Sequence, residues 1–322
     1  MRKRLINVLK LVLSIGLVAM LLSRVSLRHA LDVLAQAQWG FLGLALALYV
    51  GGVALRALRW QALLRAKGIA VPLPRLVTLY YVGGFFNIML PTGIGGDAVR
   101  AYELARYTPH VETAVGTVLL DRAAGLVMLF CMAALALPFS AGLLDPWVSL
   151  LVLGLTAGSL AVLVSLFWGR PLRRAFHSLP AALRRMLDRP ILRRLFEALS
   201  GYDGRALAAA LGISVGFNLL LIAVNVLIGL GLGVRSVTLG QYAAFVSLIS
   251  ASTALPISFG GWGVREGGYT ALYPRAGVAV PTAMAMALTF DLINVLAGLI
   301  GGVLYAYEGA RGAWARKEAE RA

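Results

Sequence analysis

Apolar runs of about 20 residues recur along this chain and limit what it can fold into, because a helix of that length crosses the hydrocarbon core of a bilayer. Hydrophobic residues make up 60% of the 322 residues and charged residues only 14%. A soluble domain is nearer half apolar and a quarter charged. The sequence therefore predicts an all-α polytopic membrane protein. The alternative is a soluble all-α protein whose helices are deeply buried.

Six of the apolar runs are predicted to be full transmembrane helices, at about 5–22, 39–58, 111–137, 147–168, 206–234 and 281–307. Basic residues gather between them, first in a predicted loop from Arg56 to Arg75 and then in the polar segment 169–205, which contains nine arginines. Apolar residues at helical spacing in 169–205 are typical of amphipathic helices on the inner leaflet, and an ordinary positive-inside loop is the alternative.

Two related motifs interrupt the remaining apolar sequence. The first reads P-T-G-I-G-G-D-A-V-R from Pro91 to Arg100, and the second reads P-I-S-F-G-G-W-G-V-R-E from Pro256 to Glu266. Proline, a glycine pair, valine and arginine recur at a constant offset of 165 residues. Paired Gly/Pro interruptions in two halves of a membrane protein point to a central binding site.

The apolar segment before the first motif is too short for a full span, since it begins near Leu76 and reaches Pro91. We therefore predict that 76–106 forms a re-entrant helical hairpin, and that 239–275 forms a second one. With the N-terminus inside, only five of the 30 lysines and arginines then fall outside the cytoplasmic half, namely Arg24, Arg28, Arg235, Arg265 and Arg275.

This topology makes the two hairpins enter from opposite faces of the membrane. Repeat unit one, about 39–137, is then related to repeat unit two, about 206–307, by inverted topology, as in many transporters. The prediction is a single membrane domain over 1–322, with a basic cytoplasmic segment at 169–205 and a charged tail at 308–322. Both termini are expected in the cytoplasm of a cell whose inner membrane holds the protein.

The hairpin tips are expected to meet in the interior, because backbone inside a membrane must be satisfied by protein or by a water-lined cavity. The helix after each tip would point its partly positive N-terminus at that place, and Arg100 and Arg265 would add full charges. Arginine suits phosphate because its planar fork donates two parallel hydrogen bonds. The alternative is that each arginine pairs with a local carboxylate and only holds its hairpin. The candidate substrate-binding residues are Pro91, Gly95, Gly96, Asp97, Arg100, Pro256, Gly260, Gly261, Gly263, Arg265 and Glu266.

Three further charged residues lie inside predicted spans, namely Asp121, Arg122 and Asp291. Intramembrane charges are costly and usually face the protein interior. We interpret them as charge balance for the motif arginines, while uptake of a proton is a second role for Asp291. Glycine spacing at Gly212 and Gly216, and at Gly298, Gly301 and Gly302, predicts close helix packing.

No catalytic group, cofactor or metal site is predicted. Cys131 is the one cysteine, the three histidines His29, His110 and His177 lie in predicted loops, and the sequence has no nucleotide-binding motif. The net charge of +16 comes from basic stretches between apolar runs, without the interleaved aromatic residues of single-strand binders, so nucleic acid is not expected as a partner.

At the two motifs the chain resembles the lysylphosphatidylglycerol synthase transmembrane-region family, also called the flippase-like family. The likeness covers about residues 5–310; the pair Asp121-Arg122 is similar to the acidic–arginine pair of the family, and Asp97 stands where many relatives carry glutamate. The resemblance implies lipid translocation. Because only a short charged tail follows Tyr307, the soluble aminoacyl-transferase domain of two-part members is not expected, and neither is lysyl-lipid synthesis.

We therefore expect an inner-membrane flippase for an anionic phospholipid or lipid-linked phosphate, with no enzyme activity, and homo-oligomers are compatible with the sequence. Two alternatives remain. One is a membrane-embedded transferase for a polyprenyl-phosphate or sterol-like lipid. The other is a non-transporting partner of a separately encoded lipid-modifying enzyme, bound through 169–205.

Overall fold

The structure is a computed structural model, and it is helical throughout the described part of the chain apart from short connections. It describes residues 33–89, 95–108, 110–140, 142–168, 199, 201–254 and 261–319. The predicted first span at 5–22, the motif residues Pro91, Pro256 and Gly260, and most of the arginine-rich segment 169–205 lie outside these ranges.

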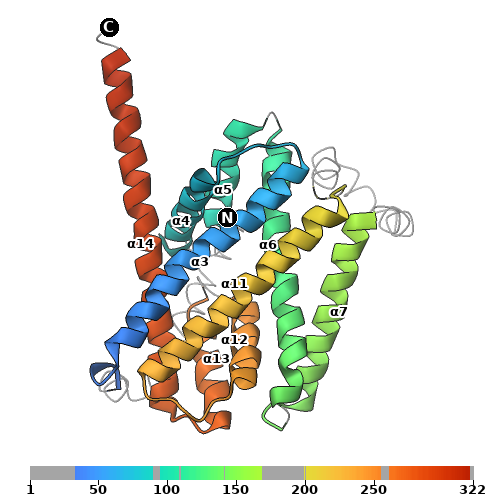
Figure 1. The fold of residues 1–322 in the computed structure, drawn as a ribbon, viewed down its shortest axis with the longest axis vertical. Helices are drawn as coiled ribbons and strands as arrows, with labels where there is room; N and C mark the ends of the chain where they lie inside the picture. Colours follow the sequence, from blue (N-terminus) through green and yellow to red (C-terminus); the bar gives the residue numbers. More distant parts are fainter. Residues whose placement is uncertain are drawn as a thin grey trace, which may run out of the picture.

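Five described helices are long and apolar enough to cross a membrane. They match five of the predicted spans and confirm a multi-pass membrane protein. The helices are α3 (Trp39–Ala66), α6 (Val111–Ala136), α7 (Pro146–Trp168), α11 (Gly204–Gly231) and α14 (Val280–Ala319). The apolar part of α14 ends near Glu308, and the charged sequence beyond it continues the same helix (Figure 1).

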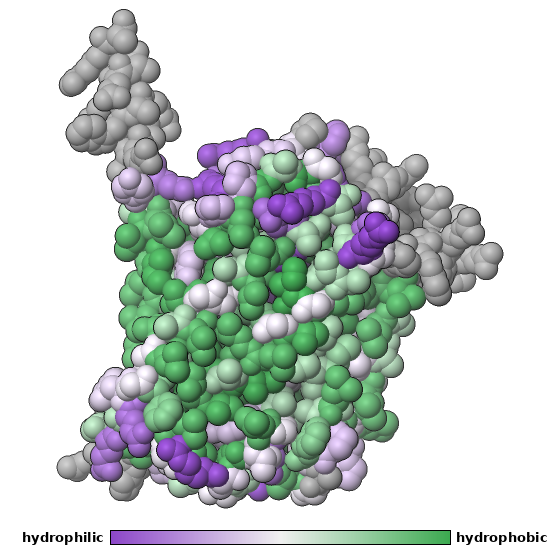
Figure 2. Space-filling model, in the orientation of Figure 1, coloured by the Kyte–Doolittle hydropathy of each residue, from purple (hydrophilic) through white to green (hydrophobic). Residues whose placement is uncertain are grey.

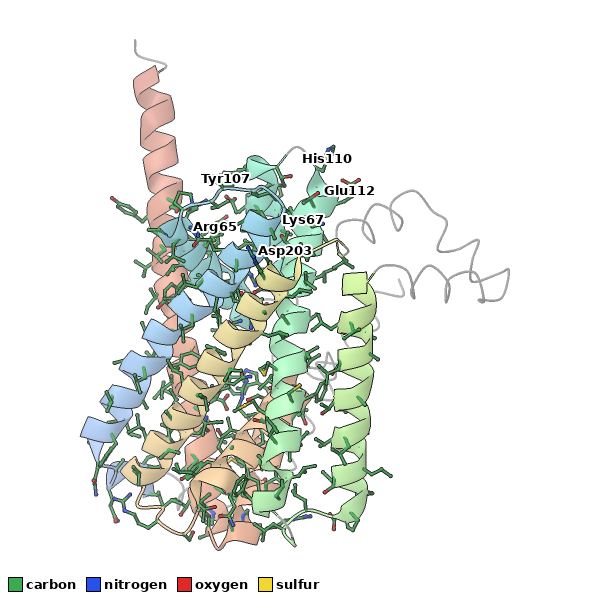
Figure 3. The ribbon with its side chains drawn as sticks, turned by 45° about the vertical axis from the view of Figure 1, so that its right-hand side comes forward. Arg65, Lys67, Tyr107, His110, Glu112 and Asp203 are labelled. Atoms are coloured by element: carbon green, nitrogen blue, oxygen red, sulfur yellow. The ribbon has the colours of Figure 1, made fainter. Side chains whose placement is uncertain are left out.

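The surface agrees with this assignment. A broad hydrophobic belt covers the visible face of the molecule between two polar ends (Figure 2). On the spanning helices α7 and α14, Leu150, Val162 and Val303 are more than half exposed, as lipid-facing side chains would be. One polar end carries Arg65, Lys67, His110 and Asp203 (Figure 3).

Four shorter helices form two pairs at the motifs. The first pair is α4 (Leu73–Met89) and α5 (Gly95–Leu104), which continues through the 3-10 turn Ala105–Tyr107. The second pair is α12 (Leu239–Ala254) and α13 (Val264–Leu272), followed by the 3-10 turn Tyr273–Ala276. The α4–α5 pair lies in the upper half of the molecule and the α12–α13 pair in the lower half (Figure 1).

The long helices hold these pairs in place. α3 and α11 run side by side across the molecule, and α14 packs along α4. Glycines allow the second contact, since a Cβ on Gly301 would lie 1.9 Å from the Tyr81 carbonyl oxygen and one on Gly298 would lie 2.2 Å from Ile88. The described part of the chain offers no partner for the predicted close packing at Gly212 and Gly216, because a Cβ at either position would meet none of the described residues within 4 Å.

The predicted basic loop from Arg56 to Arg75 is also wrong in its first half. α3 does not end near residue 58 but continues to Ala66, so Arg56 and Arg59 lie within it. Arg59 is only 5% exposed. A buried arginine needs a partner for its charge, and that partner is a carboxylate on α6, described below.

Candidate functional site

A cavity of about 360 Å³ lies between the two helix pairs. Its walls come from α3, α4, α5, α6, α11, α12, α13 and α14. Arg100 on α5 and Arg265 on α13 both line it, together with Asp97, Gly261, Asp121, Arg122 and Asp291 from the sequence predictions. The structure thus brings the two motif arginines, 165 residues apart in the sequence, to one place.

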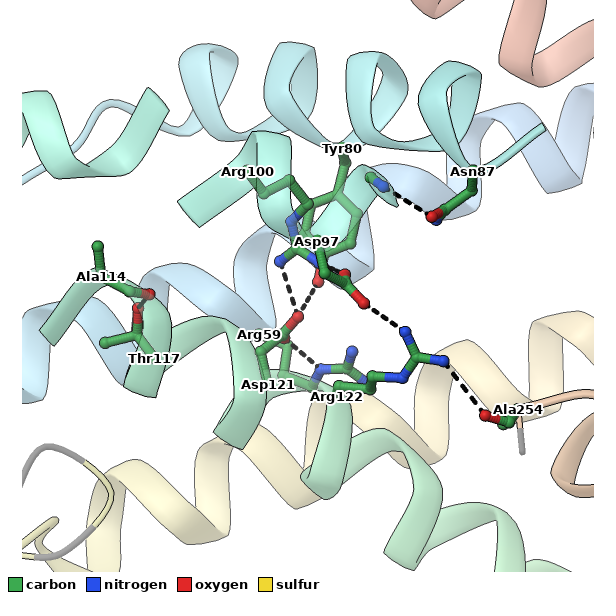
Figure 4. A network of polar contacts seen from close by, with 11 residues as sticks. Arg59, Tyr80, Asn87, Asp97, Arg100, Ala114, Thr117, Asp121, Arg122 and Ala254 are labelled. Atoms are coloured by element: carbon green, nitrogen blue, oxygen red, sulfur yellow. Dashed lines mark hydrogen bonds and ion pairs between the residues drawn. The ribbon is translucent and has the colours of Figure 1, made fainter. Parts of the chain in front are cut away.

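Asp121 is the centre of the larger polar cluster in this cavity (Figure 4). Its Oδ1 accepts a hydrogen bond from Arg59 Nε at 2.8 Å, and its Oδ2 accepts one from Arg100 Nη2 at 2.8 Å. The Tyr80 hydroxyl also donates to Oδ2. Arg59 Nη1 in turn donates to Ser214 Oγ on α11, 3.2 Å away. The Asp121 carboxylate therefore joins α3, α4, α5 and α6 at one point.

Arg100 is held by aromatic rings as well as by charge. Its guanidinium carbon lies 3.8 Å from the Tyr80 ring centroid and 4.2 Å from that of Trp60. Arginine over an aromatic face gains cation–π energy, more so where water is excluded. Arg100 is 4% exposed, so its position and direction are fixed.

Arg122 connects the two helix pairs. It pairs with Asp97 on α5, and its Nη2 donates to the Ala254 carbonyl oxygen at the end of α12, 3.2 Å away (Figure 4). Asp97 also accepts from Arg100 Nη1 at 3.2 Å. The two members of the Asp121-Arg122 pair therefore have different partners. Asp121 binds Arg100 on α5, and Arg122 reaches the end of α12.

The start of α5 touches α4 closely. The backbone N–H of Gly96 donates to Asn87 Oδ1 at 2.8 Å. A Cβ on Gly96 would lie 1.9 Å from the Gly83 carbonyl oxygen, so a larger residue would push the two helices apart. Gly95 is buried beside it, and this local packing sets where Arg100 points.

Arg265 forms the smaller cluster at the other side of the cavity. It pairs with Asp291 on α14 and lies 5.3 Å from the Phe290 ring centroid. Glu266 caps its own helix by accepting from the Gly263 N–H at 2.8 Å. Gly261 and Gly263 have φ values of +86° and +81°, which glycine adopts readily and other residues rarely do.

Several buried polar groups facing the cavity have no hydrogen-bond partner among the described residues. Arg100 Nε and Asn218 Nδ2 are unpartnered donors, and Asp291 Oδ2 is an unpartnered acceptor. Buried polar atoms are nearly always satisfied by protein, water or a ligand, so each of these atoms is open to a water molecule or a bound group.

The cavity is positively charged. Among the described residues that line it, Arg56, Arg59, Arg100, Arg122 and Arg265 outnumber Asp97, Asp121 and Asp291. Glu266, the buried neighbour of Arg265 in the chain, makes this excess smaller. A low-dielectric site with surplus arginines favours an anion.

Sequence reasoning missed Arg59, Tyr80, Trp60 and Asn218 as members of the site. Arg56 and Arg59 were visible as two arginines three residues apart, a spacing that places both on one helix face. If the helix is continued through these two arginines, as in α3, they lie inside a span, and this position predicts a buried partner for their charge.

The chain was compared with known proteins. The sequence model of the family described as "Lysylphosphatidylglycerol synthase TM region" matches residues 7–302. A search of the curated proteins found no match. The matched range includes both motifs, Asp121, Arg122 and Asp291. On this match over most of its length, and with the membrane-spanning helices described above, the chain belongs to the lysylphosphatidylglycerol synthase TM-region family.

Proposed function

We propose that this protein translocates an anionic phospholipid or lipid-linked phosphate between the leaflets of the membrane, and that the cavity between the helix pairs binds the headgroup. The proposal assigns the chain no catalytic step, cofactor or metal. Its partner is the anionic lipid, which enters from a leaflet rather than from water.

The observation that carries the proposal is the convergence of Arg100 and Arg265, from two separate helix pairs, on one cavity with surplus positive charge. The unpartnered Arg100 Nε and Asn218 Nδ2 add two buried donors. A phosphate group supplies several acceptor oxygens and negative charge, so it would satisfy both features.

The carboxylates explain how such a site can both bind and release. Arg100 and Arg265 are paired in the structure, with Asp121 and Asp291 respectively. An arriving phosphate would exchange with these carboxylates rather than meet bare cations, which would be costly to keep buried. A site that binds strongly enough to receive a headgroup and weakly enough to release it suits transport.

We further propose that α4–α5 and α12–α13 are re-entrant hairpins that enter from opposite membrane faces as inverted repeats, alongside six full spans. Their positions in opposite halves of the molecule support this (Figure 1). The end that carries Arg65 and Lys67 is assigned to the cytoplasm by the positive-inside rule, and the termini with it. In this arrangement, the cavity can open to one leaflet at a time.

Transport can be tested with the purified protein in phosphatidylcholine vesicles that contain a fluorescent phosphatidylglycerol. Chemical quenching of the outer leaflet then reports exchange between leaflets. Wild-type protein is expected to speed this exchange, and Arg265→Ala to abolish the gain. Arg275→Ala is the matched control, because Arg275 is exposed and pairs with Asp145 outside the cavity.

Asn218→Leu separates binding from scaffolding. Asn218 Nδ2 donates to no described group, so its loss breaks no hydrogen bond from that atom and stability should change little. We expect the variant to fold as wild type, judged by its thermal unfolding, and to transport the anionic lipid more slowly. Wild-type rates in both Arg265→Ala and Asn218→Leu would contradict the proposed role of the cavity.

A further inference from the structure

The two carboxyl groups of Glu266 and Asp291 lie together in the smaller cluster. Glu266 is 4% exposed and Asp291 is 5% exposed. Asp291 accepts a hydrogen bond from Arg265 on Oδ1, and Glu266 follows Arg265 in the first turn of α13, so both acids belong to the Arg265 cluster. Asp291 Oδ2 nevertheless has no donor among the described residues. Two ionised carboxylates cannot satisfy each other, because neither has a proton to donate.

The surroundings supply one cation for the two acids. Arg265 pairs with Asp291, while Arg56 on α3 lines the same cavity and places its guanidinium over the Tyr80 and Phe217 rings. The nearby tyrosines donate elsewhere: Tyr49 to Asn294 Oδ1 at 2.7 Å, and Tyr269 to Asn225 Oδ1. Tyr242 on α12 and Tyr273, which stacks on the Tyr269 ring, lie near Tyr269. None of these groups neutralises a second buried carboxylate.

The Asp121 cluster has the opposite balance. There, Arg59 and Arg100 both contact Asp121, and Arg100 and Arg122 contact Asp97. Every aspartate oxygen in that cluster has a donor. The two sides of the cavity are therefore chemically different: one side has surplus cations, and the other has a surplus carboxyl group.

We propose that Glu266 and Asp291 form a proton-binding site, in which one proton from the aqueous phase bridges the two carboxyl groups, and that its occupancy is linked to binding of the anionic headgroup at Arg265. The shared proton gives Asp291 Oδ2 its missing partner and leaves one negative charge opposite Arg265. Like-charged carboxylates in one site hold such a proton because both cannot ionise together. The linkage, which rests on the proposed function, makes the proton the coupling ion.

The direction of the coupling follows from competition for Arg265. When a phosphate binds Arg265, Asp291 loses its counter-ion and its affinity for a proton rises. By reciprocity, protonation of Asp291 releases Arg265 and tightens phosphate binding by the same factor. Acidification should therefore strengthen binding of an anionic lipid, and lipid and proton should cross together.

Infrared difference spectroscopy of the full chain in phosphatidylcholine vesicles tests the proton site without any transport assay. We expect a band from a protonated carboxylic acid at neutral pH, where solvated aspartate and glutamate are ionised. Glu266→Gln and Asp291→Asn should each lose this band, because the remaining carboxyl group would pair with Arg265 and ionise. Asp145→Asn, at an exposed turn, should keep it. Absence of the band in folded wild-type protein would overturn the site.

The linkage is tested by exchange of fluorescent phosphatidylglycerol across vesicles with an imposed pH difference. One pH unit should bias the wild-type rates in the two directions by up to about tenfold, because one unit is a tenfold change in proton activity. In Asp291→Asn this bias should disappear. A band without a bias would overturn the coupling, and a bias that survives in Asp291→Asn would overturn the assignment. Absence of exchange in wild type would instead contradict the proposed function, while the band would still decide the proton site.

Discussion

Asp121 shows how single residues set the architecture of this site. Its two oxygens accept from Arg59, Tyr80 and Arg100, and it is 1% exposed. Burying charges is costly unless they are paired and hydrogen-bonded. Once the partners are in place, removal of one of them leaves the others buried without compensation, so the cluster is sensitive to every member.

Replacing this carboxylate should destabilise the protein strongly. In Asp121→Asn, Arg59 and Arg100 lose their shared counter-charge, and we expect a loss of about 3–5 kcal/mol, as for other broken buried pairs. Thermal unfolding of the detergent-purified protein measures this. The matched control is Asp145→Asn, whose exposed pair with Arg275 should contribute about 0–1 kcal/mol. Equal stabilities for the two variants would contradict the account of the cluster.

The sequence predicted the motif arginines and the acids Asp121 and Asp291 that balance them, but it did not predict Arg59. The motifs were visible because proline, glycine and arginine stand out in apolar sequence. The role of Arg59 was hidden because its partner lies 62 residues away, and a local pattern cannot show a long-range ion pair. Hydropathy alone ended the helix at the first arginines, whereas the pair with Asp121 allows α3 to continue.

At the scale of elements, helix contact in this molecule depends on glycine at particular places. α14 lies against α4 at Gly298, Gly301 and Gly302, where added side chains would meet Ile88, the Tyr81 backbone and Phe85. Gly212 has the spacing of a packing motif, but a Cβ there would meet no described residue within 4 Å. Spacing in the sequence predicts that a helix face is small, but the partner that fills the space is set by the tertiary fold.

Gly301→Ala should therefore weaken the α4–α14 contact. Its Cβ would lie 1.9 Å from the Tyr81 carbonyl oxygen, and relief of such overlap costs about 1–3 kcal/mol. Gly212→Ala makes no new contact with the described residues and removes a flexible glycine from a helix, so its stability should equal or exceed that of wild type. Thermal unfolding of both variants provides the comparison. A tolerated alanine at Gly301 would show that the helices pack less closely.

At the scale of the whole molecule, the hydrophobic belt and the polar ends define how the protein sits in a membrane. Five predicted spans are confirmed as helices of sufficient length and hydropathy. Composition was enough for this, because the bilayer imposes a length and an apolar surface on every spanning helix. The shared cavity depends on how eight helices meet, and this was predicted only as a meeting of two motifs.

The orientation of the molecule can be measured directly. His110 and Ser236 are exposed, and His110 lies at the end that we assign to the cytoplasm (Figure 3). In a Cys131→Ala background, we expect an impermeant thiol reagent to label His110→Cys only from the cytoplasmic side and Ser236→Cys only from the other side. Labelling of both cysteines from one side would contradict the topology.

The most direct measurement asks whether an anionic lipid occupies the cavity. Ser250 on α12 lines it, and Ser250→Cys in the Cys131→Ala background would report occupancy through its rate of labelling by a small thiol reagent. We predict slower labelling in vesicles rich in phosphatidylglycerol than in phosphatidylcholine alone, and loss of this protection in Arg265→Ala. Equal labelling rates in both lipids would contradict the claim that the cavity binds an anionic headgroup.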